Sequence, residues 1–370
     1  MQRILGSQPN RRLSLGLPHL SFRDKGVYRG RMTAFVRSAS LGNYAEVARR
    51  HGLDPPAMLR EAKLNPAFLS NPDLRISTAA VVALLEESAR RSRCPTFGLE
   101  MAESWRMSDF GALSLLLMHQ PTLRDALTAT IRYRHLLNDA LSLAIEDAGA
   151  LVIVREELVG EAAARSRQSI ELAIGVVFRM FRALLGPSWH PRRVQFTHAA
   201  PPDLRVHRRI FGPKVEFNGD FNGIVCDAAD LDRPNPGADP AMASHAQRFV
   251  DSLPGARAAG LVHDVRRSIY MLLPRGRASV EQIAQVLGTN PRALQRKLEE
   301  SGESFTALLN DARRELVVRY LENPAYSVTQ VGEMLGYNFP SSFTRWFVGQ
   351  FGTSPARWRA GRAGGEASPG

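Results

Sequence analysis

The pattern of apolar and polar positions in the C-terminal third of the chain occurs twice, because residues 279–288 align with residues 327–336. Each copy opens with Ser-x-x-Gln, a capping box that starts a helix, and then places apolar residues three or four positions apart. Each copy closes on a glycine, Gly288 or Gly336, where a residue with positive φ would end the helix. The pattern predicts two short helices with equivalent ends.

A second helix follows each glycine within four residues. In the first copy Asn290 is a natural N-cap and Pro291 takes the first helical position, whereas Pro340 opens the helix of the second copy after one extra residue. Leucines in the first copy and phenylalanines in the second are spaced to face inward, which leaves one polar face outside. That face holds Arg292, Gln295, Arg296 and Glu299 in the first copy, and Ser341, Ser342, Thr344 and Arg345 in the second. This arrangement is typical of a helix-turn-helix unit that binds DNA.

Residues 305–321, between the two copies, are apolar at helical spacing and predict one helix that ends at Asn323 and Pro324. Its length of roughly 25 Å, at ~1.5 Å per residue, is compatible with two recognition helices on one face of DNA, in major grooves ~34 Å apart. An array of helical repeats that binds protein is the alternative that such a repeat leaves open.

These residues resemble the arabinose-operon activator (AraC/XylS) family of transcription regulators. The matching stretch covers about residues 260–360 and includes GYN at 336–338, SFTRWF at 342–347 and FGTSP at 351–355. The resemblance implies an all-α domain of seven helices with two helix-turn-helix units. By position, it places Arg292, Gln295 and Arg296 against bases in the first unit, and Pro340, Ser341, Thr344 and Arg345 in the second. Pro340 departs from this role, because it offers no side-chain hydrogen bond.

Three upstream segments, 111–139, 189–212 and 226–240, are similar to the N-terminal domain of the ornithine-utilisation-regulator branch of the same family. This resemblance covers about residues 35–240 and implies an effector-sensing domain there. It does not identify the effector.

The N-terminal half mixes helical and strand patterns. Amphipathic helices are predicted at 77–91 and 122–138, and alternating residues at 141–146 and 151–157 predict a β-hairpin. The remaining elements are helices at 162–185 and 203–211 and strands at 193–197, 215–217 and 223–226. This order predicts an α+β fold for the effector-sensing domain, followed by the all-α C-terminal domain. Residues 45–61 have the spacing of a third helix-turn-helix unit, but a helical hairpin packed on the sensing domain is the preferred interpretation.

The predicted organisation has five parts. They are a basic, disordered extension at 1–31, an effector-sensing domain at 32–235, a linker at 236–256, a DNA-binding domain at 257–362 and a disordered tail at 363–370. A break in composition at Met32 predicts that the natural chain starts there.

The chain has 370 residues and a formal charge of +12, to which both ends contribute strongly. An excess of positive charge suits a polyanionic partner, although an arginine-rich composition is a simpler explanation, because only four of the 48 basic residues are lysine. The two cysteines are far apart, which predicts a reducing compartment and no structural zinc. The longest apolar runs are too short to cross a bilayer, and no signal peptide is evident, so we expect a cytoplasmic, nucleoid-associated protein without a membrane partner.

The sequence has no glycine-rich phosphate loop, no GxSxG elbow and no HExxH motif. His198 and His207 do not have the context of a metal-ligand motif. We therefore expect no enzyme activity, no metal and no cofactor. The candidate ligand-binding residues of the N-terminal half are Arg106, Arg132, Tyr133, His135 and Asn138, of which the arginines could neutralise a carboxylate.

The sequence thus predicts a ligand-responsive DNA-binding activator of transcription. Its expected partners are operator DNA, a small-molecule effector and RNA polymerase, with a second copy of the chain as a further candidate. Two alternatives stay open: a regulator controlled by a protein partner without a small ligand, and an enzyme fused to a DNA-binding module.

Overall fold

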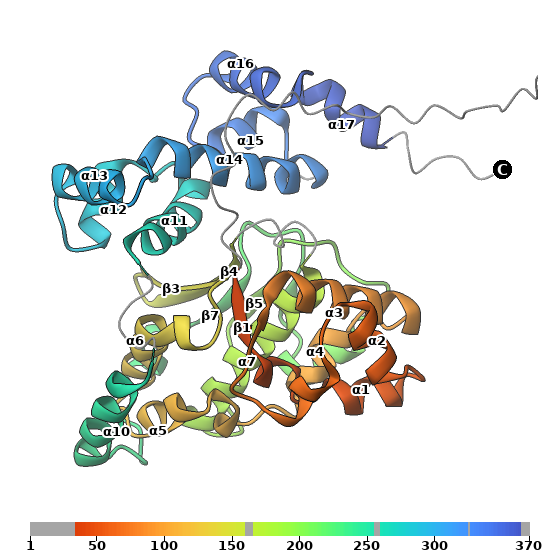
Figure 1. Ribbon diagram of the computed structural model, residues 1–370, viewed down its shortest axis with the longest axis vertical. Coiled ribbons are helices and arrows are strands. Elements are labelled where there is room, and N and C mark those ends of the chain that lie inside the picture. Colours follow the sequence, from red (N-terminus) through yellow and green to blue (C-terminus); the bar gives the residue numbers. More distant parts are fainter. Residues whose placement is uncertain (1–33, 160–165, 255–259, 325, 364–370) are drawn as a thin grey trace, which may run out of the picture. The chain divides into compact units, whose positions relative to one another are not determined.

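The computed structural model of the chain describes residues 34–159, 166–254, 260–324 and 326–363 (Figure 1). The predicted extension at 1–31, the start at Met32 and nearly all of the predicted tail at 363–370 lie outside these residues. These described residues belong to one compact unit.

The alternating pattern after residue 140 forms the predicted hairpin, in which β3 (Leu141–Ala148) pairs antiparallel with β4 (Leu151–Leu158). The hairpin extends into a five-stranded sheet of order β3-β4-β7-β5-β6. The other strands are β5 (Arg193–Gln195), β6 (Val215–Glu216) and β7 (Gly223–Asp227). Every neighbouring pair is antiparallel except β5 and β6. The strands predicted in this half are therefore confirmed.

Helices cover this sheet and bury its apolar residues. They are α5 (Ala112–Met118), α6 (Leu123–Tyr133), α7 (Arg167–Leu185), α8 (Arg205–Phe211) and α9 (Ala228–Leu231). The predicted helix at 122–138 starts where Thr122 accepts a hydrogen bond from the N–H of Asp125. The central helix α7 buries Ile174 and Phe178, four residues apart, in the same core as Val152 and Val154 of β4.

A second core lies before this sheet in the sequence. The short antiparallel strands β1 (Phe35–Arg37) and β2 (Arg75–Ser77) join α1 (Tyr44–Arg50), α2 (Pro55–Glu61), α3 (Thr78–Ser92) and α4 (Phe97–Glu103). Helices α1 and α2 are the hairpin expected at 45–61, and their buried residues Val47 and Leu59 pack into this core. The expected hairpin of helices packed on the N-terminal half is confirmed.

The structure corrects the prediction of a linker at 236–256. It contains helix α10 (Pro240–Ser252), which packs against α5 and contributes Ala246 and Val250 to the core of the N-terminal half. The cause is local: Asp239 caps this helix and Pro240 is its first residue, a strong start signal inside a Pro/Asp-rich stretch. Short 3-10 helices complete the described chain: η1 (Ser38–Leu41), η2 (Pro66–Ser70), η3 (Met107–Phe110), η4 (Arg134–Leu136) and η6 (Leu273–Arg275).

The C-terminal part is helical throughout its described residues, as predicted. The described residues of this part form seven α-helices: α11 (Leu261–Leu272), α12 (Val280–Val286), α13 (Pro291–Glu300), α14 (Phe305–Glu322), α15 (Val328–Met334), α16 (Pro340–Phe351) and α17 (Pro355–Ala363). They share one hydrophobic core, to which α14 contributes Leu308, Ala312 and Leu316. Within the described residues, no helix is both long and apolar enough to span a membrane.

Candidate DNA interface and ligand cavity

The first helix-turn-helix unit consists of α12 and α13. Ser279 Oγ accepts a hydrogen bond from the N–H of Gln282, whose own Oε1 accepts one from the N–H of Ser279, so the predicted capping box is formed. The turn glycine, Gly288, has a φ of 62°. Asn290 then caps α13 by accepting from the N–H of Ala293 at 2.9 Å. The predicted starts of both helices are confirmed.

The second unit repeats this construction in α15 and α16. Ser327 and Gln330 form the equivalent capping box, with reciprocal hydrogen bonds of 2.7 and 3.1 Å. Gly336 has a φ of 76°, and Pro340 is the first residue of α16 as predicted.

Small residues let the paired helices cross closely. A Cβ added to Gly332 of α15 would lie 3.1 Å from the ring of Phe343 in α16. Phe343 and Phe347 are buried against this crossing, as Leu294 and Leu298 are buried in the first unit. Because the two units and α14 share one core, α14 connects them through packed side chains.

The polar faces of the two recognition helices lie where the sequence predicts. Arg292, Gln295, Arg296, Ser341, Ser342 and Arg345 are exposed, and Thr344 is half-buried. The guanidinium of Arg296 lies 3.7 Å from the carboxylate of Glu300, and both side chains are largely exposed. Among the described residues, Arg292 and Arg345 have no hydrogen-bond or ion-pair partner. Their contact with DNA stays a prediction.

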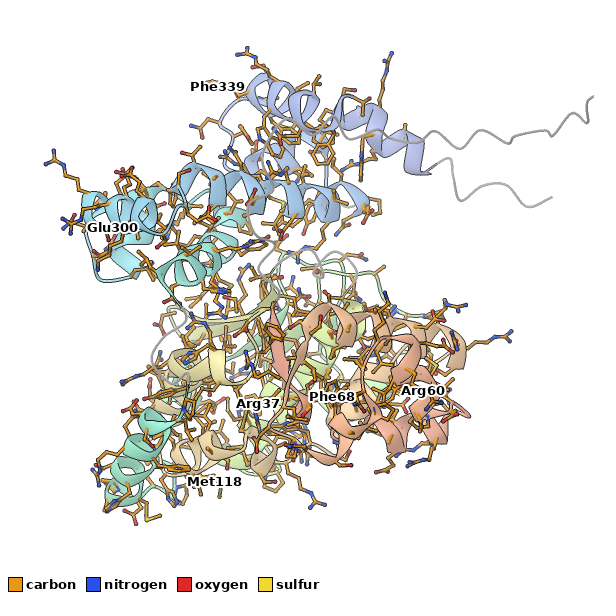
Figure 2. All side chains as sticks on the ribbon, viewed as in Figure 1. Arg37, Arg60, Phe68, Met118, Glu300 and Phe339 are labelled. Atoms are coloured by element: carbon orange, nitrogen blue, oxygen red, sulfur yellow. The ribbon has the colours of Figure 1, made fainter. Side chains whose placement is uncertain are left out.

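One residue of this surface was missed by the sequence analysis. Phe339 is the N-cap of α16, but it makes no capping hydrogen bond, and 67% of its surface is exposed (Figure 2). No large apolar side chain of the described residues is more exposed. The available signal was its alignment with Asn290, since each of the two residues directly precedes the proline that opens a recognition helix.

A cavity of about 160 Å³ lies inside the N-terminal half. Its walls come from β1, η1, α3, η3, the end of α6, the β3–β4 hairpin and α7, and most of the side chains are apolar. In Figure 1, β1, α3 and α6 are labelled near α7 and the sheet. The cavity thus draws on both cores of the N-terminal half.

Several polar atoms in the cavity wall have no partner within the described protein. They are Ser40 Oγ, Thr78 Oγ1, Ser169 Oγ and Glu156 Oε2, each buried. Burial, reinforced by the neighbouring carboxylate of Glu157, raises the pKa of Glu156 to about 8. Since buried polar groups are generally hydrogen-bonded, these atoms leave hydrogen-bonding capacity in the cavity wall that the described protein does not use.

The predicted ligand residues are only partly brought together. Asn138 lines the cavity, whereas the other four candidates are not among its lining residues. Tyr133 Oη donates to Asp251 at 2.5 Å, and Arg132 lies 3.9 Å from the same carboxylate, so both face α10. Arg106 is exposed before η3, and His135 is buried in η4.

The cavity was not apparent from the sequence because its wall comes from many separate segments. Glu156, Ser169 and Thr78 each appear as an isolated polar residue in an apolar stretch. A buried glutamate on a predicted strand was the one available signal, since ionisable residues are seldom fully buried.

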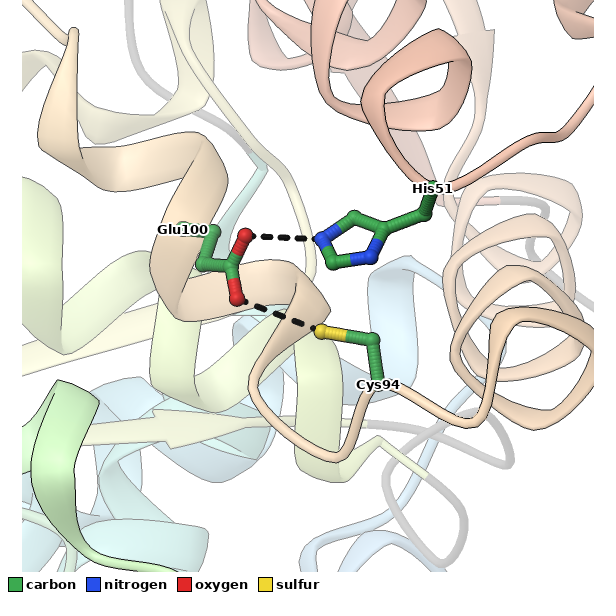
Figure 3. A group of neighbouring side chains, drawn as sticks. All are labelled: His51, Cys94 and Glu100. Carbon is green, nitrogen blue, oxygen red and sulfur yellow. Dashed lines mark hydrogen bonds and ion pairs between the residues drawn. The ribbon is translucent and has the colours of Figure 1, made fainter.

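A separate group of possible metal ligands joins α1 to α4 (Figure 3). The donor atoms of His51, Cys94 and Glu100 lie within 4.8 Å of one another. His51 Nε2 is 2.8 Å from Glu100 Oε2, and Cys94 Sγ donates to Glu100 Oε1 at 3.3 Å. Burial raises the pKa of the Cys94 thiol, which keeps it protonated. These mutual contacts satisfy the three groups as a hydrogen-bonded cluster.

His198 and His207 also meet in space. The Nε2 atom of each lies 3.3 Å from Glu171 Oε1 on α7, and Arg167 of the same helix is 3.1 Å from that oxygen. Burial lowers the pKa of His198, so a neutral imidazole is favoured there. Arg167 therefore supplies the positive charge for the buried Glu171.

Strand β4 carries neighbouring carboxylates with different environments. Glu156 lines the cavity, and the next residue, Glu157, accepts a hydrogen bond from Arg319 of α14 at 2.9 Å. Arg134, which also lines the cavity, donates to Asp264 of α11. Two side chains at or beside the cavity are therefore ion-paired with helices of the C-terminal part.

These features define a class of protein: a DNA-binding transcription regulator with two helix-turn-helix units behind an α+β domain. Residues 52–235 match the family described as the arabinose-binding domain of AraC transcription regulators, and residues 283–361 match a helix-turn-helix domain. The transcriptional regulator VirS of Mycobacterium tuberculosis is 31% identical over 329 residues, which are 88% of this chain and 97% of that protein. The chain belongs to the AraC family of transcription regulators.

Other similar proteins are more distant. The ornithine utilization regulator of Pseudomonas aeruginosa is 24% identical over 85% of this chain and 93% of its own length. The solved structure of the transcriptional regulator CdpR from the same organism has 21% sequence identity and a TM-score of 0.44, over 87% of this chain and 96% of that one.

Proposed function

We propose that this regulator is a ligand-responsive activator that reads two successive major-groove segments of its operator. The single observation that carries the proposal is the occurrence, in one chain, of two helix-turn-helix units, each opened by a capping box, and a cavity with unpartnered polar atoms. In this proposal Arg292, Gln295, Arg296, Ser341, Ser342, Thr344 and Arg345 face DNA. The effector occupies the cavity, and RNA polymerase is the partner at the promoter, in the cytoplasm.

The ion pairs beside the cavity support a connection between effector and DNA affinity. A ligand that changes the position of β4 or η4 would also change Glu157–Arg319 or Arg134–Asp264. By linkage, an effector that binds the DNA-bound state more tightly raises operator affinity by the same factor that DNA raises effector affinity.

The test starts from selection of operator sequences out of a random library with the full chain. Transcription in vitro from a promoter carrying the selected site, with RNA polymerase and a series of candidate effectors, then measures activation. We expect the transcript level to rise only when protein and effector are both present. Repression, or activation that no small molecule changes, would contradict the proposal.

A further inference from the structure

The cavity of the N-terminal half allows its ligand to be described by chemistry. Apolar side chains such as Val81, Leu85, Val177 and Met180 supply most of its wall, so the ligand has to be mostly apolar. Its volume of about 160 Å³ is comparable to engineered cavities of ~150 Å³ that bind benzene. A single ring, or an aliphatic group of similar bulk, fits this space.

The charged groups of the wall are already compensated by protein. Arg37 donates to Asp73 at 2.7 Å and to the carbonyl of Asp109 at 2.9 Å, and Arg134 pairs with Asp264. The carboxylate of Asp109 accepts from the N–H of Arg106. An anionic ligand that took the place of Asp264 would leave that carboxylate, which is about 25% exposed, without Arg134, whereas Asp73 is 76% exposed and would be solvated if a ligand replaced it.

Glu156 differs from these groups, because its Oε2 has no partner in the described protein. The neighbouring charge that acts on it is the carboxylate of Glu157 on its own strand, and the cavity wall also holds Arg37 from β1, Asp109 from η3 and Arg134 from η4. The two arginines are engaged elsewhere, and burial raises the pKa of Glu156 to about 8. At neutral pH this carboxyl group is protonated and presents an O–H donor.

We propose that the cavity binds an uncharged, mostly apolar molecule with one hydroxyl or carbonyl oxygen, which accepts a hydrogen bond from Glu156. The hydroxyls of Ser40, Thr78 and Ser169 offer further donors and acceptors to the same ligand. This assignment rests on the proposed function, since it names the class of effector. A cationic amine is the competing class, but it requires an ion pair buried in an apolar wall, where desolvation of both charges opposes binding.

The test uses four probes of nearly equal size on the full chain: benzyl alcohol, toluene, benzoate and benzylamine. Calorimetry and thermal unfolding report binding, because a ligand of the native state raises the unfolding temperature. We expect benzyl alcohol to bind roughly three- to tenfold more tightly than toluene, which is the worth of one hydrogen bond. Benzoate and benzylamine are expected to bind more weakly than either.

The pH dependence separates the two competing classes. Affinity for benzyl alcohol should fall as the pH rises through 8, because Glu156 loses its donor proton, whereas affinity for benzylamine would rise over the same range. Glu156→Gln keeps a donor and should bind benzyl alcohol without this pH dependence. Glu156→Leu should abolish the preference for benzyl alcohol over toluene. Ser114→Ala, which removes a hydroxyl outside the cavity wall, is the matched control and should change nothing.

Tighter binding of benzylamine or benzoate overturns the assignment, and so does an unchanged preference in Glu156→Leu. If none of the probes binds, the cavity is not a site for single-ring ligands and the assignment fails. Operator affinity measured with and without benzyl alcohol tests the proposed function separately: binding without any effect on operator affinity leaves the ligand class intact and contradicts the effector role.

A second inference concerns Phe339 and rests on the DNA-reading part of the proposed function. Asn290 and Phe339 both directly precede the proline that opens a recognition helix, but only Asn290 caps its helix. An apolar N-cap weakens a helix, and the exposed ring gains little packing in return. When a residue violates a local sequence preference, here that for a polar N-cap, and gains no packing in return, a functional role is the expected reason.

The first residues of a recognition helix contact base edges, and the thymine C5-methyl group in the major groove takes apolar contacts, including those of phenylalanine. We infer that Phe339 contacts a thymine methyl group and so adds a sequence preference to a helix whose other outward residues are mainly serines. Phe249→Asn, which changes another exposed phenylalanine outside the DNA-binding helices, is the matched control.

The test compares Phe339→Asn with the wild-type chain on the selected operator, with each thymine replaced in turn by deoxyuridine. Loss of one methyl group should weaken wild-type binding about fourfold at one position, the worth of one buried methyl group, and should not affect the variant. The variant should also unfold at a higher temperature, because Asn restores the cap. Equal sensitivity of both proteins at every thymine would overturn the inference.

Discussion

The ionisation of Glu156 makes the stability of the fold depend on pH, because its pKa differs between the folded and the unfolded chain. Burial raises its pKa from 4.5 to about 8. Between these pH values the folded chain binds the proton more tightly than the unfolded chain, so this group's contribution to stability is lost as the pH rises toward 8. Glu156→Gln removes the ionisation and should be more stable than wild type above pH 8, with a difference that shrinks toward pH 4.5.

Urea unfolding of both proteins at pH 5, 7 and 9 measures this difference. Glu86, whose pKa burial raises to about 7, is present in both chains and therefore cancels. Glu46→Gln, at an exposed ion pair with Arg50, serves as the control and should follow wild type at each pH. A stability difference for Glu156→Gln that does not vary with pH would show that the carboxyl group is not buried in its protonated form.

Arg296 and Arg345 occupy corresponding positions on the two recognition helices, and we expect them to act differently. Gln295 and Arg292 surround Arg296 with polar side chains, so Arg296→Ala should cost about 1–3 kcal/mol and relax the preference at one base pair. Arg345 has mainly serines beside it. Its loss should weaken binding to the same extent for every operator sequence, and it should lower the slope of log affinity against log salt concentration by about one unit.

Binding of both variants to a saturated operator library separates base reading from phosphate contact. Arg50→Ala in the sensing domain is the control for loss of one exposed positive charge. An unchanged sequence preference in Arg296→Ala would refute its assignment as a base-reading residue.

At the scale of elements, local signals predicted the helix-turn-helix units well. Capping boxes at Ser279 and Ser327 depend on residues three positions apart, and the structure forms both. The hairpin at β3 and β4 also follows from a local pattern. Strands β1 and β2 were missed because each has three residues and pairs with a partner about 40 positions away. The cavity could not be predicted for the same reason, since Glu156 and Thr78 come together only through the tertiary fold.

The crossing of α15 and α16 gives a prediction about two glycines. Gly332→Ala places a methyl group 3.1 Å from Phe343, whose ring is held by Tyr337 and Phe347, so we expect destabilisation. Gly349→Ala in α16 has open space around the new Cβ and should stabilise by about 0.5–1 kcal/mol through helix propensity. Thermal unfolding of both variants gives the comparison, and equal stabilisation would mean that the crossing tolerates a larger residue.

The caps of the two units can be tested in the same way. Ser327→Ala removes the acceptor for the N–H of Gln330 and should cost about 1 kcal/mol. Thr329→Ala, at an exposed position inside the same helix, is the matched control and should be neutral or slightly stabilising. If Ser327→Ala melts like wild type, the capping box does not stabilise α15 in solution.

For the whole molecule, the arrangement of the helices determines how many chains one operator needs. Helix α14 has 18 residues and is therefore about 27 Å long, and its buried side chains lie in the same core as both units. One chain thus carries two recognition helices that packing holds together, whereas a typical helix-turn-helix dimer obtains its two from separate subunits.

We therefore expect one full chain to protect two neighbouring major-groove segments on one face of the selected operator. Footprinting gives the protected positions, and sedimentation of the complex gives the number of chains per DNA. Inserting about five base pairs between the two segments should rotate one of them by about half a turn and abolish binding of the single chain. Inserting about ten base pairs restores the helical phase, but it should also abolish this binding, because the segments then lie farther apart than α14 can reach. Substituting Arg345 alone should weaken protection of one segment only. Protection of a single segment, or a requirement for two chains on one site, would contradict this arrangement and assign the second unit a structural role.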